Sequence, residues 1–189
     1  RTQVFPMMAS RRLLAWGALA SSLLLASPSL ARTETTPVGE IEATIGDAPY
    51  VGATLDVPSE GTSTAEYQSF GPVLSISIQA HDPQSDSIMH NVLSVEISLM
   101  GTDASASLMD GSSVSWWPKG MSEPFYMSEN SGQEPEIVLE ALSLEEGAAR
   151  ARGRFSARMC RQDGFTSEPD LTDCLTVEGR FDTALRKGG

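Results

Sequence analysis

Basic side chains are scarce in this sequence of 189 residues. It contains 13 Lys and Arg against 25 Asp and Glu, which gives a formal net charge of −12. Proteins that bind nucleic acid need a basic surface, and adhesion to anionic lipid needs clusters of Lys and Arg. The composition argues against both classes, and we expect no nucleic-acid partner. With 40% hydrophobic and 20% charged residues, the chain is typical of a globular protein rather than a disordered one.

Cysteine is almost absent, since the sequence has two Cys in all. Cys160 and Cys174 are separated by 14 positions and form no Cys-x-x-Cys motif, which disfavours redox catalysis. In an oxidising compartment a lone pair of this kind favours one disulfide, with two free buried thiols as the alternative.

Long apolar runs are also lacking, with one exception near the beginning of the sequence. Arg11 and Arg12 precede an uncharged segment rich in Leu and Ala, Leu13 to Ala26, and the small residues Ser29 and Ala31 follow it. The segment is shorter than the roughly 20 residues that a membrane span needs. We therefore expect residues 1–31 to comprise a short extension and a signal peptide cleaved after Ala31.

Cleavage at that position would place the mature protein in the periplasm or outside the cell, without a transmembrane segment. A plain positively charged signal is the favoured interpretation, and a twin-arginine signal is the alternative. The mature chain would carry 10 basic and 25 acidic residues, a net charge of −15. Eight of these basic residues follow Ala149, so the charges are strongly segregated along the chain. An acidic body of this kind could attract basic proteins, although solubility explains it as well.

Apolar and polar residues alternate along several short segments separated by turn-forming residues, and no segment has a convincing helical period. The strands expected from this pattern are 41–45, 51–57, 64–70, 74–80, 93–99, 113–117, 125–127, 136–144, 149–160 and 175–185. The clear strands 74–80 and 93–99 should pair as a hairpin with a long loop. The sequence predicts an all-β fold: a polar tether over 32–39, then a single antiparallel β-sandwich or barrel-like domain over 40–189, ending in a three-stranded meander.

Two similar tripeptides, Gly153 to Phe155 and Gly179 to Phe181, predict the register of the last two strands. If Cys160 lies directly opposite Cys174 in an antiparallel pair, each phenylalanine falls opposite the glycine of the other tripeptide. An aromatic ring that covers the facing glycine stabilises a strand pair. The cysteine pair and both phenylalanine–glycine pairs agree on this one alignment.

The same alignment puts a stripe of arginines on the face opposite the core. The stripe consists of Arg150, Arg152, Arg154 and Arg158. A three-residue turn at Glu145 to Gly147 would bring Glu140 opposite Arg152, whose other neighbour would be Asp182. We expect a structural charge ladder in which Arg152 contributes most to stability, rather than a binding site for anions.

Candidate metal ligands occur in one connection, where His81, Asp82, Asp86 and His90 lie within ten positions. Imidazole and carboxylate groups could hold Zn²⁺ or a similar ion. Their spacing matches no metal-binding signature, and a solvated turn at Asp82 is the favoured interpretation. Neither a Gly-x-Ser-x-Gly elbow nor a phosphate-binding glycine loop is present, and we expect no cofactor.

Candidate binding residues occur in the turn-rich region 101–135, where four aromatic residues fall within eleven positions: Trp116, Trp117, Phe125 and Tyr126. Neighbouring residues on a strand point to opposite faces. One tryptophan is therefore expected in the core, and the other is the better candidate for contact with a partner.

These observations favour a small exported, non-catalytic β domain that binds another protein or a component of the cell envelope. One alternative is a periplasmic hydrolase or metal-dependent enzyme that uses His81 and His90. A carrier of small ligands is another alternative, if the strands close around a cavity.

Overall fold

A computed structural model describes residues 33–189, and Thr33–Gly189 form one compact unit. The predicted signal peptide lies outside the described residues. Within 33–189 there is no helix, and the chain forms thirteen strands. They are β1 (Thr36–Ile45), β2 (Ala48–Val57), β3 (Thr62–Ser63), β4 (Ala65–Phe70), β5 (Val73–His81), β6 (Val92–Met100), β7 (Ser107–Leu108), β8 (Ser113–Trp117), β9 (Phe125–Met127), β10 (Glu136–Ser143), β11 (Arg150–Gln162), β12 (Asp170–Ala184) and β13 (Arg186–Lys187).

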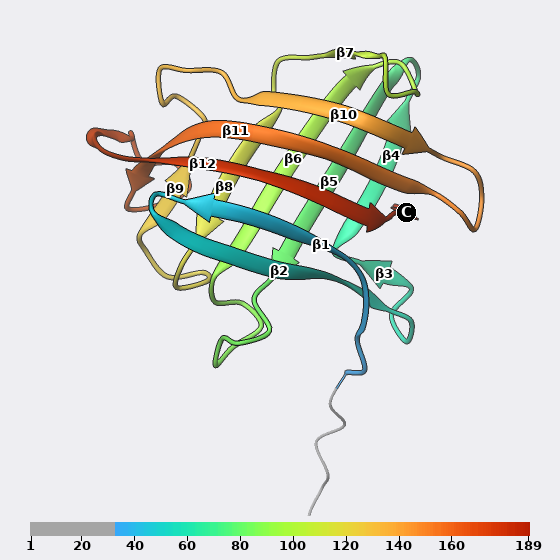
Figure 1. The fold of residues 1–189 in the computed structure, drawn as a ribbon, viewed down its shortest axis with the longest axis horizontal. Helices are drawn as coiled ribbons and strands as arrows, with labels where there is room; N and C mark the ends of the chain where they lie inside the picture. Colours follow the sequence, from blue (N-terminus) through green and yellow to red (C-terminus); the bar gives the residue numbers. More distant parts are fainter. Residues whose placement is uncertain (1–32) are drawn as a thin grey trace, which may run out of the picture. The chain divides into compact units, whose positions relative to one another are not determined.

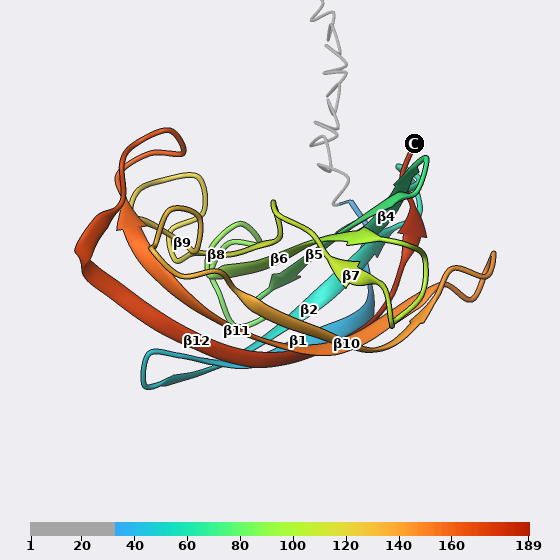
Figure 2. The same ribbon diagram turned by 90° about the horizontal axis from the view of Figure 1, so that it is seen from above.

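The strands form two layers whose directions cross steeply (Figure 1). In the first layer the order is β10-β11-β12-β1-β2, and in the second layer β4, β5, β6, β8 and β9 lie side by side. Figure 2 shows how β11 and β12 curve around the second layer. Pairing of β9 with β11, and of β2 with β5, joins the layers into a closed circuit of hydrogen-bonded strands. The all-β prediction is confirmed. No helix in the described part of the chain is long and apolar enough to cross a membrane.

The core lies between the two layers and is built from the alternating residues that the sequence pattern singled out. Ile41 and Phe181 of the first layer, and Leu74, Ile76 and Leu93 of the second, are almost completely buried. The long-looped hairpin is confirmed, because β5 pairs with β6 along its whole length. Burial of each apolar row fixes the register, since a slip of one residue would turn that row toward solvent.

The first strand begins earlier than expected. β1 starts at Thr36 and pairs with β2 from that residue onward, so half of the segment expected to be a tether, 32–39, belongs to the sheet. Gly39 also begins the pairing of β1 with β12, where a Cβ would collide with the backbone of Thr183. The polar composition of residues 36–39 did not indicate that their backbone groups pair with neighbouring strands.

The register predicted for β11 and β12 is confirmed. Cys160 lies opposite Cys174, and Phe155 lies opposite Gly179. A Cβ on Gly179 would come within 2.7 Å of Cζ of Phe155, and one on Gly153 within 2.7 Å of Cζ of Phe181. The rings therefore occupy the space that the glycine side chains leave. Both strands extend beyond the predicted ends, to Gln162 and Asp170.

The pairing of β10 with β11 is predicted correctly at one end and differs at the other. Glu136 lies opposite Ser156 as expected, but the register shifts between Leu139 and Ala141. Glu140 falls in this bulge, so Ala141 rather than Glu140 lies opposite Arg152. The β10–β11 connection comprises residues 144–149 instead of the three residues expected. The bulge compensates for the resulting shift of the register by one residue.

The arginine stripe nevertheless forms ion pairs within the sheet. The carboxylate of Glu140 lies 3.5 Å from Nε of Arg152 and 3.2 Å from Nη1 of Arg154. Arg150 donates to Asp182 at 2.7 Å. Arg152 thus keeps its expected partner Glu140, whereas Asp182, which lies opposite Arg152, pairs with Arg150 instead.

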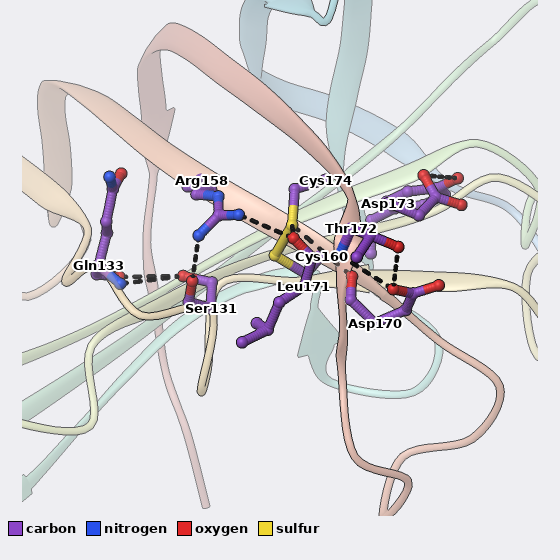
Figure 3. Close-up of a disulfide and its surroundings, with 10 residues drawn as sticks. Ser131, Gln133, Arg158, Cys160, Asp170, Leu171, Thr172, Asp173 and Cys174 are labelled. Atoms are coloured by element: carbon purple, nitrogen blue, oxygen red, sulfur yellow. Dashed lines mark hydrogen bonds between the residues drawn. A yellow bond between two sulfur atoms is a disulfide. The ribbon is translucent and has the colours of Figure 1, made fainter.

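The predicted disulfide joins Cys160 to Cys174, with an S–S distance of 2.05 Å (Figure 3). It links β11 to β12 where both strands approach their connecting loop. Beside it, Arg158 donates to the carbonyl oxygens of Ser131 at 2.7 Å and Leu171 at 3.0 Å. Arg158 therefore differs from the other arginines of the stripe, because its partners are backbone groups.

Candidate functional site

The two tryptophans of β8 point to opposite faces of the second layer. Trp116 packs against the core, its ring centroid lies 5.5 Å from that of Tyr126, and its Nε1 donates to Oδ1 of Asn91 at 2.7 Å. Trp117 lies on the outer face, and its buried Nε1 has no hydrogen-bond partner within the described residues. Trp117 is therefore the tryptophan closer to a possible partner.

Phe165 covers Trp117 from a loop that sequence reasoning did not single out. Its ring centroid lies 6.0 Å from that of Trp117 and 4.3 Å from that of Phe125. Phe125 is 3% exposed and Phe165 is 47% exposed. The three rings form an aromatic stack that runs from the protein interior to its surface. Phe165 lies within the segment that the disulfide closes, so the bridge restrains the loop that carries it.

Two further loops lie near this stack, since the β8–β9 loop joins Trp117 to Phe125 and contacts the β5–β6 loop. The backbone N–H of Asn91, at the end of the β5–β6 loop, donates to the carbonyl oxygen of Pro118 in the β8–β9 loop at 3.1 Å. Gly120 has a φ of +64°, and a Cβ there would lie 2.5 Å from the carbonyl oxygen of Met89. A glycine at this position lets the two loops approach closely.

The three loops begin or end at neighbouring strand ends, because Val92 pairs with Trp117 and Gln162 pairs with Phe125, and each loop exposes apolar side chains. These side chains are Ile88 at 51% exposure, Met89 at 38%, Met121 at 64% and Phe165 at 47%. Together with Trp117 beneath Phe165, we call them the loop-end surface. Single exposed apolar side chains are common, but a group of them marks a site of interaction.

Acidic side chains outnumber basic ones in and beside the three loops. Residues 82–91, 118–124 and 161–173 contain seven Asp and Glu against two Lys and Arg. One of the two cations, Arg161, already pairs with Asp163 and Asp173. The surface therefore combines exposed apolar side chains with a net negative charge in and beside its loops, which suits a partner with apolar and basic residues.

The candidate metal ligands make separate hydrogen bonds in the β5–β6 loop. Nδ1 of His81 lies 2.6 Å from the carbonyl oxygen of Ile88, and Nδ1 of His90 lies 2.8 Å from Oδ1 of Asp86. Asp82 accepts from Nδ2 of Asn91 at 2.7 Å and from the backbone of its own turn. Within residues 33–189, no three His, Cys, Asp or Glu side chains are grouped so that they could share a metal ion.

His81 has one unusual feature. The side chain is 7% exposed, and its buried Nε2 has no partner among the described residues. Because a carbonyl oxygen only accepts, Nδ1 of His81 carries the proton that bonds Ile88. His81 thereby holds the loop against the sheet and places Ile88 at the surface.

One carboxylic acid on the outer face of the second layer has a perturbed pKa. Burial raises the pKa of Glu96 above its ordinary value, while hydrogen bonds from Ser77 at 2.8 Å and Ser94 at 2.9 Å oppose that effect. Both donors are hydroxyl groups, that of Ser77 on the neighbouring strand β5 and that of Ser94 on β6 itself. Glu96 thus ties β5 to β6 and has no second acid or base beside it with which to share a proton.

In comparisons with known proteins, no model of a known family, no curated protein and no solved structure matches the chain. The site is therefore defined by its own geometry.

Sequence reasoning found part of the loop-end surface and missed the rest. Trp117 and Phe125 belong to the aromatic stack, whereas Trp116 and Tyr126 pack against the core. The one signal for Phe165 was an aromatic residue among turn-forming and charged residues inside the disulfide-closed segment. Ile88 and Met89 lie in one loop and Met121 in another, and no period in the sequence connects them.

Proposed function

We propose that this protein is an exported, non-catalytic recognition domain that binds a protein or envelope component through its loop-end surface. The observation that carries the proposal is the group of four exposed apolar side chains on three neighbouring loops, Ile88, Met89, Met121 and Phe165. Such a group costs solubility unless a partner covers it for part of the time. The disulfide supports export, because disulfides persist in oxidising compartments.

The charge around the surface specifies the partner further. A net negative charge in and beside the loops attracts basic side chains and speeds association at low ionic strength. The aromatic stack offers a ring pre-positioned at the surface, with little side-chain freedom to lose on binding. We infer a partner whose contact region carries one or more apolar anchors flanked by Lys or Arg.

Affinity capture from the native envelope tests the proposal with matched variants. The test variant carries Phe165→Ser and Met121→Ser, and the control carries Phe70→Ser. Phe70 is 61% exposed on β4, outside the three loops. We expect the same partner to be captured by the unaltered protein and the control, to be lost with the test variant, and to be released at high salt. Equal capture by all three proteins would refute the proposal.

A further inference from the structure

A hollow of about 910 Å³ lies at the opposite end of β11 from the loop-end surface. Its lining comes from the beginnings and ends of strands in both layers, among them Val38 of β1, Tyr67 of β4 and Arg150 of β11. The 144–149 loop forms one wall, and small side chains there keep the hollow open. The volume falls in the range of small-molecule sites in proteins, about 300–1,000 Å³.

Cations are concentrated in the lining of this hollow. Three of the nine Lys and Arg among residues 33–189 line it, namely Arg150, Arg186 and Lys187. The acidic lining residues are two, Asp56 and Glu146. With Asp182, which pairs with Arg150, the three cations face three acids, so the hollow is far less negative than the rest of the chain. A concentration of cations in a strongly acidic protein favours a small anionic ligand, and the surrounding negative charge disfavours large polyanions.

The three cations differ in how much of their hydrogen-bonding capacity is used. Arg186 donates from Nε and Nη2 to the carboxylate of Asp56 at 2.7–2.9 Å, which holds its side chain in place. Arg150 uses Nε for Asp182, and its two terminal nitrogens make no hydrogen bond within the described residues. Lys187 is exposed and has no ion pair with any carboxylate of residues 33–189. Arg150 is held by Asp182 on the outer face of the sheet, so Lys187 is the cation available to a ligand.

The base of the hollow is apolar and reaches the core. Tyr67, Ala149 and Leu185 line it, are 7–8% exposed, and belong to the buried core cluster. A fully hydrated inorganic ion would leave this base uncovered. A ligand with an apolar body would instead cover the small part of these side chains that is still exposed.

We propose that this hollow binds a small organic anion with an apolar body, its carboxylate or phosphate group held by Lys187. The proposal concerns a second site and does not depend on the loop-end surface. A carboxylate and a phosphate ester share the required chemistry, so the two head groups are compared directly in the test.

The test is an NMR titration of the purified protein with octanoate, with octyl phosphate, and with octanol as the uncharged control. The matched variants exchange the two lysines of residues 33–189: Lys187→Glu in the hollow and Lys119→Glu in the β8–β9 loop. We expect at least one of the two anions to shift the amides of residues 146–150 and 184–187, and octanol to shift them much less. Lys187→Glu should weaken binding at least tenfold, and Lys119→Glu should leave it within twofold.

Three results would overturn the proposal. The first is the absence of shifts at these amides with both anions. The second is equal binding of octanol, which would indicate an apolar site without charge selection. The third is an unchanged affinity in Lys187→Glu while its amide spectrum remains that of the folded protein.

Discussion

Replacing Arg158 with alanine should destabilise the domain more than replacing any other arginine of the stripe on β11. The guanidinium of Arg158 donates to the carbonyl oxygen of Ser131 at 2.7 Å and to that of Leu171 at 3.0 Å (Figure 3). It thereby fastens the 128–135 segment and the beginning of β12 to the middle of β11. Ser131 is completely buried, so removal of Arg158 would take away a charged donor from the backbone of a buried residue.

The expected loss follows from the number and kind of these bonds. A hydrogen bond to a charged group contributes about 1.5–3 kcal/mol, and a partly exposed one lies at or below the lower limit. We therefore expect Arg158→Ala to lower the free energy of unfolding by about 2 kcal/mol, or Tm by roughly 4–8 °C. Arg152 contacts Glu140 at 3.5 Å, with side chains 55% and 40% exposed. An exposed ion pair of this kind contributes about 0.2–1 kcal/mol.

Urea unfolding of Arg158→Ala, Arg152→Ala and Arg158→Lys, followed by circular dichroism, measures these differences. Lysine retains the charge but has one nitrogen, so Arg158→Lys should recover part of the loss. This order replaces the expectation from the sequence that Arg152 contributes most. Equal losses for Arg158→Ala and Arg152→Ala, or a larger loss for Arg152→Ala, would refute the reasoning.

Other contacts yield predictions of the same kind. Replacing Cys160 and Cys174 with serine should lower the free energy of unfolding by roughly 3 kcal/mol, since the bridge closes a loop of about 15 residues. The finding of two titratable thiols in the unfolded, unreduced parent protein would show that the disulfide does not form. Burial raises the pKa of Glu96 above 4.5, so ionisation of this side chain opposes folding. The free energy of unfolding should therefore fall as the pH rises from 4.5 through the raised pKa of the folded state. Glu96→Gln should flatten that pH dependence and raise stability at pH 7, and an identical profile in urea unfolding from pH 4 to 8 would count against it. Finally, Phe165→Ser should increase acrylamide quenching of Trp117 in a background that lacks the other tryptophan of β8, and unchanged quenching would show that Phe165 does not shield it.

The register of the last strand pair follows from the amino-acid sequence alone, because its determinants are local and mutually dependent. Each phenylalanine needs the space that the opposite glycine leaves, and the two cysteines need to be neighbours. The same alignment then assigns every other side chain of β11 and β12 to the core or the outer face. The bulge at Glu140 was not predictable in this way, since it depends on how the 144–149 loop closes.

The alternation of apolar and polar residues was sufficient to determine the all-β fold, the principal strands and the side of each strand that faces the core, because burial acts residue by residue along a pleated strand. The remaining features depend on residues that become neighbours only in the folded structure. Whether Trp116 or Trp117 faces outward depends on which face of β8 the first layer covers, and the sequence of β8 is the same in either case. The loop-end surface joins residues up to 77 positions apart, from Ile88 to Phe165, and the hollow joins β4 to the chain's last strand. Only the folded chain brings such residues together, because their contacts are set by strand order and loop closure rather than by any period in the sequence.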